Sequence, residues 1–323
     1  VSARGFGTPT EFEVKTLRMF LHFARVPVDY AVVEVGLGGT YDSTNVLDPR
    51  ISVITNISLD HVERLGRTIP EIAEQKAGII KPGRPVVTAA RDPEALAVIE
   101  RVAAEQGAPL WRIGREFEAQ RLGYGEGWQR FSVRTPRREH ADLMIPLAGA
   151  FQVENAATAV AALDLLGTVE EEIPAEAIQR GLAEVRIAGR MEVLRRAPLF
   201  LIDGAHNAAS ATALAGALRE LYPGRRRILI LGVSADHSAA DVVGTLAPDA
   251  AIVIATQADN PRALPAEAVA AEARRHVADV RIAVPVADAV RLALELAGPE
   301  DLICATGSFF VIGEIDRQMV AHA

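Results

Sequence analysis

Carboxylate, imidazole and amine side chains occur through the first part of the chain in an order that suits metal and phosphate chemistry. Glu34 lies near the end of the apolar run VDYAVVEV, before the glycine-rich turn GLGG. Asp60 and His61 follow the next apolar run, and Lys76 lies one predicted helix further on. A buried carboxylate is costly unless it is paired or binds a metal. The pattern favours a shared metal or phosphate site, with a salt-bridged Glu34, a structural His61 and a surface Lys76 as the alternatives.

A second group of polar residues follows an apolar run in the last part of the chain. The stretch LFLIDGAHNAASATAL places Asp203, His206 and Asn207 between a predicted strand and a predicted helix. Gly204 permits a tight turn, and the beginning of the helix offers N–H groups to an anion. A turn with a helix cap explains the Asp–Gly pair, but the additional His and Asn exceed what a turn needs.

Two further positions belong with this second group. Arg190, in AGRMEV, has a guanidinium group that can reach the phosphates of a ligand. Gly307 and Ser308 follow the last predicted strand and form a weaker signal for an anion-binding loop. The P-loop pattern GxxxxGK[ST] does not occur in the sequence, and no Lys follows the glycines around Gly38. The stretch GLGG also fails to match the dinucleotide pattern GxGxxG.

Apolar runs that alternate with helical patterns should position these residues. Such alternation indicates an α/β fold with two domains, each a mostly parallel sheet with helices on both faces. Ligands bind at the carboxyl ends of parallel strands, where the candidate residues lie. The predicted strands are 28–35, 51–56, 84–89, 198–203, 225–233, 250–256, 278–286 and 300–306, with a β-rich insertion at 115–147. The predicted helices are 11–24, 69–80, 151–167, 175–185, 210–221, 238–246, 265–276, 287–297 and 309–318.

The composition argues against several classes of protein. A net charge of −8 argues against bulk nucleic-acid binding. The single cysteine, Cys304, excludes an internal disulfide and a cysteine-cluster metal site, and its apolar surroundings predict a small core residue. No uninterrupted apolar segment reaches the roughly 18 residues that a bilayer requires. We therefore expect a cytoplasmic protein that binds neither nucleic acid nor membrane.

Six ordered motifs resemble the folylpolyglutamate synthase and dihydrofolate synthase family, whose members are Mur-ligase-like, ATP-dependent, amide-forming enzymes. The motifs are EVGLGGTYDSTNV, ITNISLDHVERLGRTIPEIAEQKAGIIKPGRPVVT, FQVENA, AGRMEVL, LIDGAHNAASATAL and NPRALPAE. The resemblance runs over nearly the whole chain, from Thr10 to Glu314. Phe151 differs, since members commonly have His at this position.

The resemblance implies a ligase that adds L-glutamate to dihydropteroate or folate through an acyl phosphate made with ATP. Glu34 and His61 would be Mg²⁺ ligands, and Lys76 would match a lysine that is carbamylated in the family and then acts as a carboxylate-like ligand. Asp203 and His206 would lie near ATP and the incoming glutamate. The residues implied to contact ATP are Asn155, Arg190, Asp203, Gly38 and Ser308.

The resemblance also implies how the chain is divided. Residues 1–186 would be the remainder of a Mur-ligase-like central ATPase domain, and residues 187–323 a Rossmann-like glutamate-ligase domain. The family's P-loop lies upstream of the helix that opens this sequence. We therefore expect an N-terminally truncated piece that is inactive alone. The resemblance to the family also implies a monomer. Two other functions stay open: a Mur-type UDP-muramoyl amino-acid ligase, and a non-catalytic fragment that binds folate or nucleotide.

Overall fold

The computed structural model describes residues 7–236 and 238–322, which form two compact units. Unit 1 comprises the described residues up to Phe117 together with Ala161–Glu172. Unit 2 comprises Glu118–Val160 and the described residues from Ile173 onward. Both units contain a parallel sheet with packed helices, so the predicted α/β class is confirmed. The predicted domain boundary between residues 186 and 187 stays a prediction.

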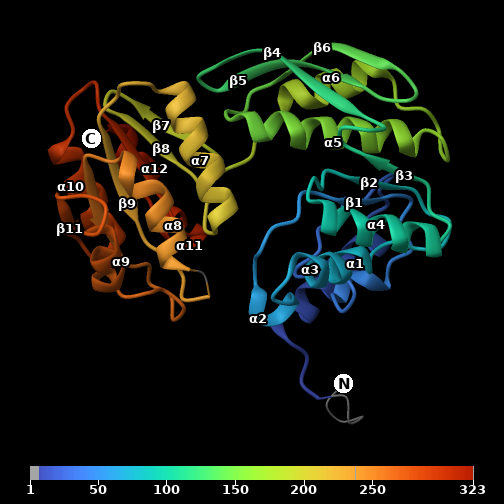
Figure 1. The fold of residues 1–323 in the computed structure, drawn as a ribbon, viewed down its shortest axis with the longest axis horizontal. Helices are drawn as coiled ribbons and strands as arrows, with labels where there is room; N and C mark the ends of the chain where they lie inside the picture. Colours follow the sequence, from blue (N-terminus) through green and yellow to red (C-terminus); the bar gives the residue numbers. More distant parts are fainter. Residues whose placement is uncertain (1–6, 237, 323) are drawn as a thin grey trace. The chain divides into compact units, whose positions relative to one another are not determined.

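Unit 1 is built around a parallel sheet in the order β1-β2-β3. Strand β1 (Ser52–Ile54) pairs with β2 (Val86–Thr88), and β2 pairs with β3 (Leu110–Arg112). Apolar side chains from β1, β2 and two helices, α3 and α4, form one buried core. The helices before the end of β3 are α1 (Glu11–Arg25), the short 3₁₀ helix η2 (Ser43–Val46), α2 (Val62–Leu65), α3 (Ile69–Ala77) and α4 (Pro93–Glu105) (Figure 1).

The local sequence explains where α3 and α4 begin. The Thr68 hydroxyl accepts the Glu71 N–H while the Glu71 carboxylate accepts the Thr68 N–H, which is a reciprocal capping box. Helix α4 begins at Pro93, directly after the capping carboxylate of Asp92. The box at the beginning of α3 fixes the first turn of the helix that carries Lys76.

The predicted strand at residues 28–35 is wrong. Within the described residues this segment is extended but belongs to no strand, and the sheet of unit 1 contains only β1, β2 and β3. Much of its apolar surface is exposed, with Val32 98% and Tyr30 54% accessible, while Val33 and Val35 are only half-buried. A β-branched run forms a strand only where a neighbouring backbone pairs with it, and no described strand does so here.

Unit 2 begins with the β-rich segment that the sequence predicts. Strands β4 (Glu118–Gly125), β5 (Trp128–Arg134) and β6 (Glu139–Ile145) form an antiparallel sheet. Helix α6 (Ala175–Glu184) packs against β6. Helix α5 (Ala150–Leu166) follows β6 in the chain, and its first residues belong to this unit.

A six-stranded sheet in the order β11-β10-β9-β12-β8-β7 forms the rest of unit 2. All neighbouring strands are parallel except β7, which runs antiparallel to β8 and was not predicted. The strands are β7 (Glu192–Arg196), β8 (Leu199–Ile202), β9 (Arg227–Leu231), β10 (Ile252–Ala255), β11 (Val280–Ile282) and β12 (Leu302–Thr306). The helices are α7 (Ala208–Leu221), α8 (Ala239–Leu246), η3 (Ala247–Asp249), α9 (Ala266–Ala273), α10 (Val286–Leu296), α11 (Phe309–Gly313) and α12 (Arg317–His322).

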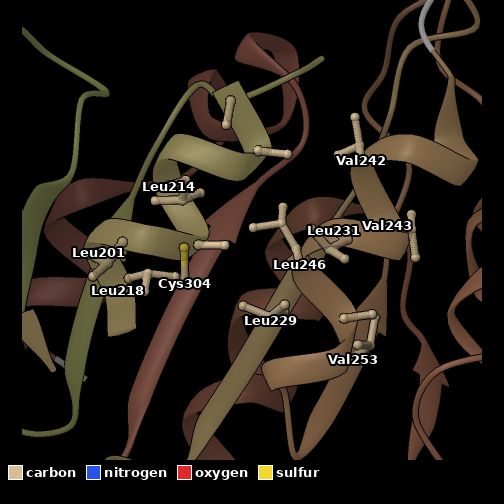
Figure 2. Packing of buried hydrophobic residues seen from close by; sticks show 14 of the residues in the cluster. Leu201, Leu214, Leu218, Leu229, Leu231, Val242, Val243, Leu246, Val253 and Cys304 are labelled. Carbon is tan, nitrogen blue, oxygen red and sulfur yellow. The ribbon is translucent and has the colours of Figure 1, made fainter. Parts of the chain in front are cut away.

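Side chains alternate between the two faces of this sheet. Leu201 and Leu229 point into a core with α7, α8 and α9 (Figure 2), whereas their neighbours Ile202 and Ile230 join a second core with α10, α11 and α12. Cys304 is fully buried in the first core, as predicted, and burial raises the pKa of its thiol well above the usual value. Within the described residues, no helix has the length and apolar character to cross a bilayer.

An ion-pair cluster at the end of β3 allows a stability prediction for unit 1. The Arg112 guanidinium donates to both Glu116 oxygens, at 2.9 and 2.7 Å, and also to Glu100. Hydrogen bonds from Arg112 hold the pKa of Glu116 below its usual 4.5 despite partial burial. Glu116→Gln is expected to lower the free energy of unfolding by about 1–3 kcal/mol at neutral pH, measured by urea denaturation.

The pH dependence of this effect has a definite sign. A carboxylate with a lowered folded-state pKa stabilises the fold above its unfolded value of 4.5, and this stabilisation is lost as the pH falls through the folded pKa. The difference between wild type and Glu116→Gln should therefore shrink below pH 4.5. Glu105→Gln, in an exposed pair with Arg101, is the control and should change little. A difference that does not vary with pH would contradict this account.

Candidate active site

The structure brings Asp60, His61 and Lys76 together in unit 1. Lys76 lies in the last turn of α3, where burial lowers the pKa of its amine and the nearby charge of Asp60 opposes this shift. His61 Nε2 lies 4.0 Å from Asp60 Oδ1. His61 also has a left-handed backbone, with φ of 48°, where α2 begins. A non-glycine residue in this conformation is uncommon and often marks a functional position.

The glycine-rich turn packs against the same helix. A Cβ at Gly38, which has a φ of +69°, would lie 2.8 Å from the Leu65 side chain, and a Cβ at Gly39 would lie 2.6 Å from the Gln75 carbonyl oxygen. The Thr40 N–H donates to that same oxygen at 2.8 Å. Close packing on α2 and α3 is therefore a sufficient reason for these glycines, and their contact with phosphate stays a prediction.

Glu34 does not occupy the buried position that the sequence suggests. It is exposed in the extended segment before the glycine turn. The contacts described for residues 7–236 and 238–322 include none between Glu34 and either His61 or Lys76. The interpretation of Glu34 as a carboxylate inside a sheet is wrong, because the strand that would bury it does not form.

The donors in unit 1 suit a cation that is held by few protein atoms. In the described part of the chain, no group of three or more His, Cys, Asp or Glu side chains is arranged around one point. Mg²⁺ keeps several waters and uses one or two protein carboxylates beside the phosphates of a substrate. Asp60 and His61 beside Lys76 fit that coordination, whereas a closed cage of protein ligands does not.

Asp203 is the organising side chain of the candidate residues in unit 2. It follows β8 and is only 4% exposed. Its Oδ2 accepts the Met191 N–H at 2.9 Å, and its Oδ1 accepts the Ala205 N–H at 2.8 Å. Burial raises the pKa of this carboxyl group, although both hydrogen bonds and the charge of Arg190 act in the opposite direction. Asp203 therefore joins the turn around Arg190 to the loop that carries His206.

Arg190 and His206 both lie against the ring of Phe309. The Arg190 guanidinium carbon is 4.9 Å from the ring centroid, and the His206 ring centroid is 5.7 Å from it. His206 Nδ1 lies 2.8 Å from the Gly204 carbonyl oxygen, which orients the imidazole. Sequence reasoning missed Phe309 because a Phe pair after a strand is typical of core packing, yet Phe309 is 45% exposed.

The remaining candidates in unit 2 have defined local partners. Ser308 is 4% exposed; its hydroxyl accepts the Phe310 N–H at the beginning of α11 and lies 3.3 Å from the Ser234 hydroxyl. Asn155 is exposed on α5, and its side-chain amide donates to Gln152 at 3.0 Å. Asn207 caps α7 through Ser210. The structure thus places Asp203, Arg190 and His206 in one cluster, and no described contact joins Asn155 to them.

Comparisons with known proteins agree with this architecture. The Mur ligase middle domain family matches residues 5–163, and the Mur ligase glutamate ligase domain family matches residues 189–309. A dihydrofolate synthase/folylpolyglutamate synthase from Bacillus subtilis is 33% identical over 319 residues, which cover 97% of this chain and 73% of that protein. The protein of the same name from Mycobacterium tuberculosis is 36% identical, with 91% of this chain and 63% of the relative covered.

Solved structures give the same result. The M. tuberculosis folylpolyglutamate synthase in complex with ADP and AMPPCP has a TM-score of 0.89 and 33% identity. The match covers 97% of this chain and 73% of the M. tuberculosis chain. Escherichia coli FolC in complex with DHPP and ADP has a TM-score of 0.86 and 30% identity. The match covers 96% of this chain and 71% of the FolC chain. The similarity includes both family domains and nearly the whole chain. The chain therefore belongs to the folylpolyglutamate synthase and dihydrofolate synthase family of Mur-ligase-like enzymes.

Proposed function

We propose that this chain carries out ATP-dependent addition of L-glutamate to dihydropteroate or folate. The observation that carries the proposal is the cluster of Arg190, Asp203 and His206 at the carboxyl ends of β8 and β12, in a chain of this family. Two relatives support the choice of ligands, since one was solved with ADP and AMPPCP and another with DHPP and ADP.

The proposed reaction has two balanced steps. A carboxylate oxygen of the pteroate or folate attacks the γ-phosphorus of ATP, which gives an acyl phosphate and releases ADP. The glutamate nitrogen then forms a bond to the acyl carbon while the carbon–oxygen bond to phosphate breaks. Inorganic phosphate leaves with the bonding electrons, and the amine gives up a proton. Positioning and charge stabilisation are the main tasks of the protein in phosphoryl transfer.

The residues of unit 1 would hold a magnesium ion. We assign Glu34, His61 and a carbamylated Lys76 as its ligands, with Asp60 beside Lys76. Carbamylation joins the Lys76 nitrogen to the carbon of CO₂ and releases a proton, which turns an amine into an oxygen ligand. When bound, Mg²⁺ neutralises charge on the phosphates. The Gly36–Thr40 turn, which follows Glu34 in the chain, contacts α3 through the Thr40 hydroxyl, which donates to the Gln75 carbonyl oxygen at 3.1 Å.

The residues of unit 2 would bind ATP and orient glutamate. The Arg190 guanidinium, held over Phe309, offers a cationic fork to phosphate oxygens. Asp203 and His206 act on ATP and the incoming glutamate, with His206 oriented by the Gly204 carbonyl. We also assign Asn155, Gly38 and Ser308 as contacts of ATP. Residues 1–186 and 187–323 would be the ATPase and glutamate-ligase domains of a cytoplasmic monomer.

A substrate panel tests this function. ADP release is measured with dihydropteroate, folate or a UDP-muramoyl substrate, each with and without L-glutamate, and products are identified by mass spectrometry. The assay uses the 323-residue chain and the chain extended by any in-frame coding sequence before Val1. We expect at least one of the two forms to give a glutamylated pterin product from dihydropteroate or folate. Turnover with UDP-muramoyl substrates only, or binding without turnover in every form, would contradict the proposal.

A further inference from the structure

The turn that carries Arg190 is held by carboxylates on both sides. The Gly189 N–H donates to Glu192 Oε2 at 2.7 Å, and the Met191 N–H donates to Asp203 Oδ2 at 2.9 Å. Gly189 and Met191 both have left-handed backbones, with φ of 69° and 46°. A residue such as Met191 adopts this conformation only where its surroundings impose it. These two hydrogen bonds therefore define the path of the backbone on either side of Arg190.

The last helix of unit 2 holds Glu192 in turn. Arg317, the first residue of α12, donates from Nε and Nη2 to the two Glu192 oxygens, each at 3.3 Å. Two parallel N–H···O contacts fix the direction of a carboxylate as well as its charge. Helix α11 also meets the turn, since a Cβ at Gly189 would lie 2.7 Å from Ile312 Cδ1.

The Glu192 carboxylate stays charged while it makes these contacts. Partial burial would raise its pKa, but the hydrogen bonds from Arg317 and from the Gly189 N–H together hold the pKa below the usual value. An ionised acceptor binds a backbone N–H more strongly than a neutral one does. Loss of the acceptor should therefore matter more to the turn than loss of the ion pair.

We propose that Glu192 is a positioning residue for Arg190, and that Arg317 holds Glu192 in place, so that the C-terminal helix α12 helps to set the nucleotide site. This inference rests on the proposed function, in which Arg190 contacts ATP. The guanidinium lies 4.9 Å above the Phe309 ring. A turn that loses its Glu192 acceptor would let the Arg190 backbone shift and would take the guanidinium away from the phosphates.

Four variants separate the acceptor from the ion pair. Glu192→Ala removes both, whereas Glu192→Gln keeps an oxygen for the Gly189 N–H and Arg317→Ala keeps the whole carboxylate. The double variant Glu192→Arg with Arg317→Glu restores an ion pair but leaves no acceptor at position 192. Asp301→Asn is the matched control, because Asp301 also accepts a glycine N–H, from Gly298 at 2.9 Å, and pairs with Arg226 at 2.6 Å.

Two readouts are measured on each variant: hydrogen exchange of the peptide at residues 186–194, and the Kd for ADP with Mg²⁺ by calorimetry. The ADP measurement uses the chain extended by any coding sequence before Val1. Glu192→Ala and the double variant should speed exchange at Gly189 about tenfold and weaken ADP binding about tenfold. Glu192→Gln and Arg317→Ala should each change both values in the same direction but less, by about threefold, and the Asp301→Asn control should change neither value.

The outcomes distinguish this inference from the proposed function. Unchanged exchange and unchanged ADP affinity in Glu192→Ala, with weaker ADP binding in Arg190→Ala, would overturn the inference and leave the proposed function in place. Recovery in the double variant would also overturn it, because an ion pair alone would then suffice. Unchanged ADP binding in Arg190→Ala would instead remove Arg190 from the proposed function, and exchange at Gly189 would still decide whether Glu192 holds the turn.

Discussion

In a form of the protein that turns over in the substrate panel, replacement of Lys76 by alanine is expected to lower glutamate addition by at least about 100-fold with little loss of fold stability. Lys76 is half-buried at the end of α3 beside Asp60, so its side chain reaches the candidate cation site and contributes little to the apolar core. If a carbamate on this lysine acts as an oxygen ligand, a small carboxylate should replace part of it. Acetate is therefore expected to restore some activity to Lys76→Ala.

Two further variants make the Lys76 test specific. Lys76→Arg keeps a cation but forms no carbamate, so it should be as inactive as Lys76→Ala. Lys15→Ala, in an exposed pair with Glu11 on α1, is the control and should be fully active. NMR of the wild-type protein with isotopically labelled bicarbonate should show a carbamate that Lys76→Arg lacks. Full activity of Lys76→Arg would show that only the charge matters and would remove the carbamate from the proposal.

The fold of unit 2 could be predicted because its strands lie in the middle of a sheet. Strands β8, β9, β10 and β12 are buried on both faces, so their sequences are continuous apolar runs between helical patterns. Strand β7 was missed for the opposite reason. It lies at the edge of the sheet, its sequence EVLRR is half-exposed and charged, and it carries no such signal.

The segment at residues 28–35 shows the limit of a local pattern. Its composition resembles that of the buried strands, yet strand formation depends on a partner backbone that the sequence of the segment does not specify. The same limit applies to the candidate site. The grouping of Asp203 with His206 followed from one loop, whereas Phe309 and Glu192 became visible only once the structure placed them against Arg190 and its turn.

Replacement of Asp203 by alanine is expected to remove activity and to lower the free energy of unfolding by about 2–6 kcal/mol. The carboxylate is the acceptor for two backbone N–H groups, those of Met191 and Ala205, in a site where Asp203 is 4% exposed. Both donors would be left without a partner away from water, at about 1–3 kcal/mol each. Urea denaturation gives the stability, and ADP release gives the activity. A variant of normal stability and activity would contradict both roles.

The isosteric variant Asp203→Asn separates the charge of this residue from its shape. An amide oxygen still accepts one N–H, but the amide nitrogen faces the other donor, so we expect a smaller loss of stability than in Asp203→Ala. Burial raises the folded-state pKa of Asp203 above 3.8, so its stabilising contribution is fully present below 3.8 and is lost as the pH rises through the folded value. The stability difference between wild type and Asp203→Asn should therefore shrink as the pH rises, the reverse of the trend at Glu116. A difference that grows with pH would mean that the two backbone N–H groups and Arg190 outweigh burial, and that Asp203 is held as a strongly stabilised anion.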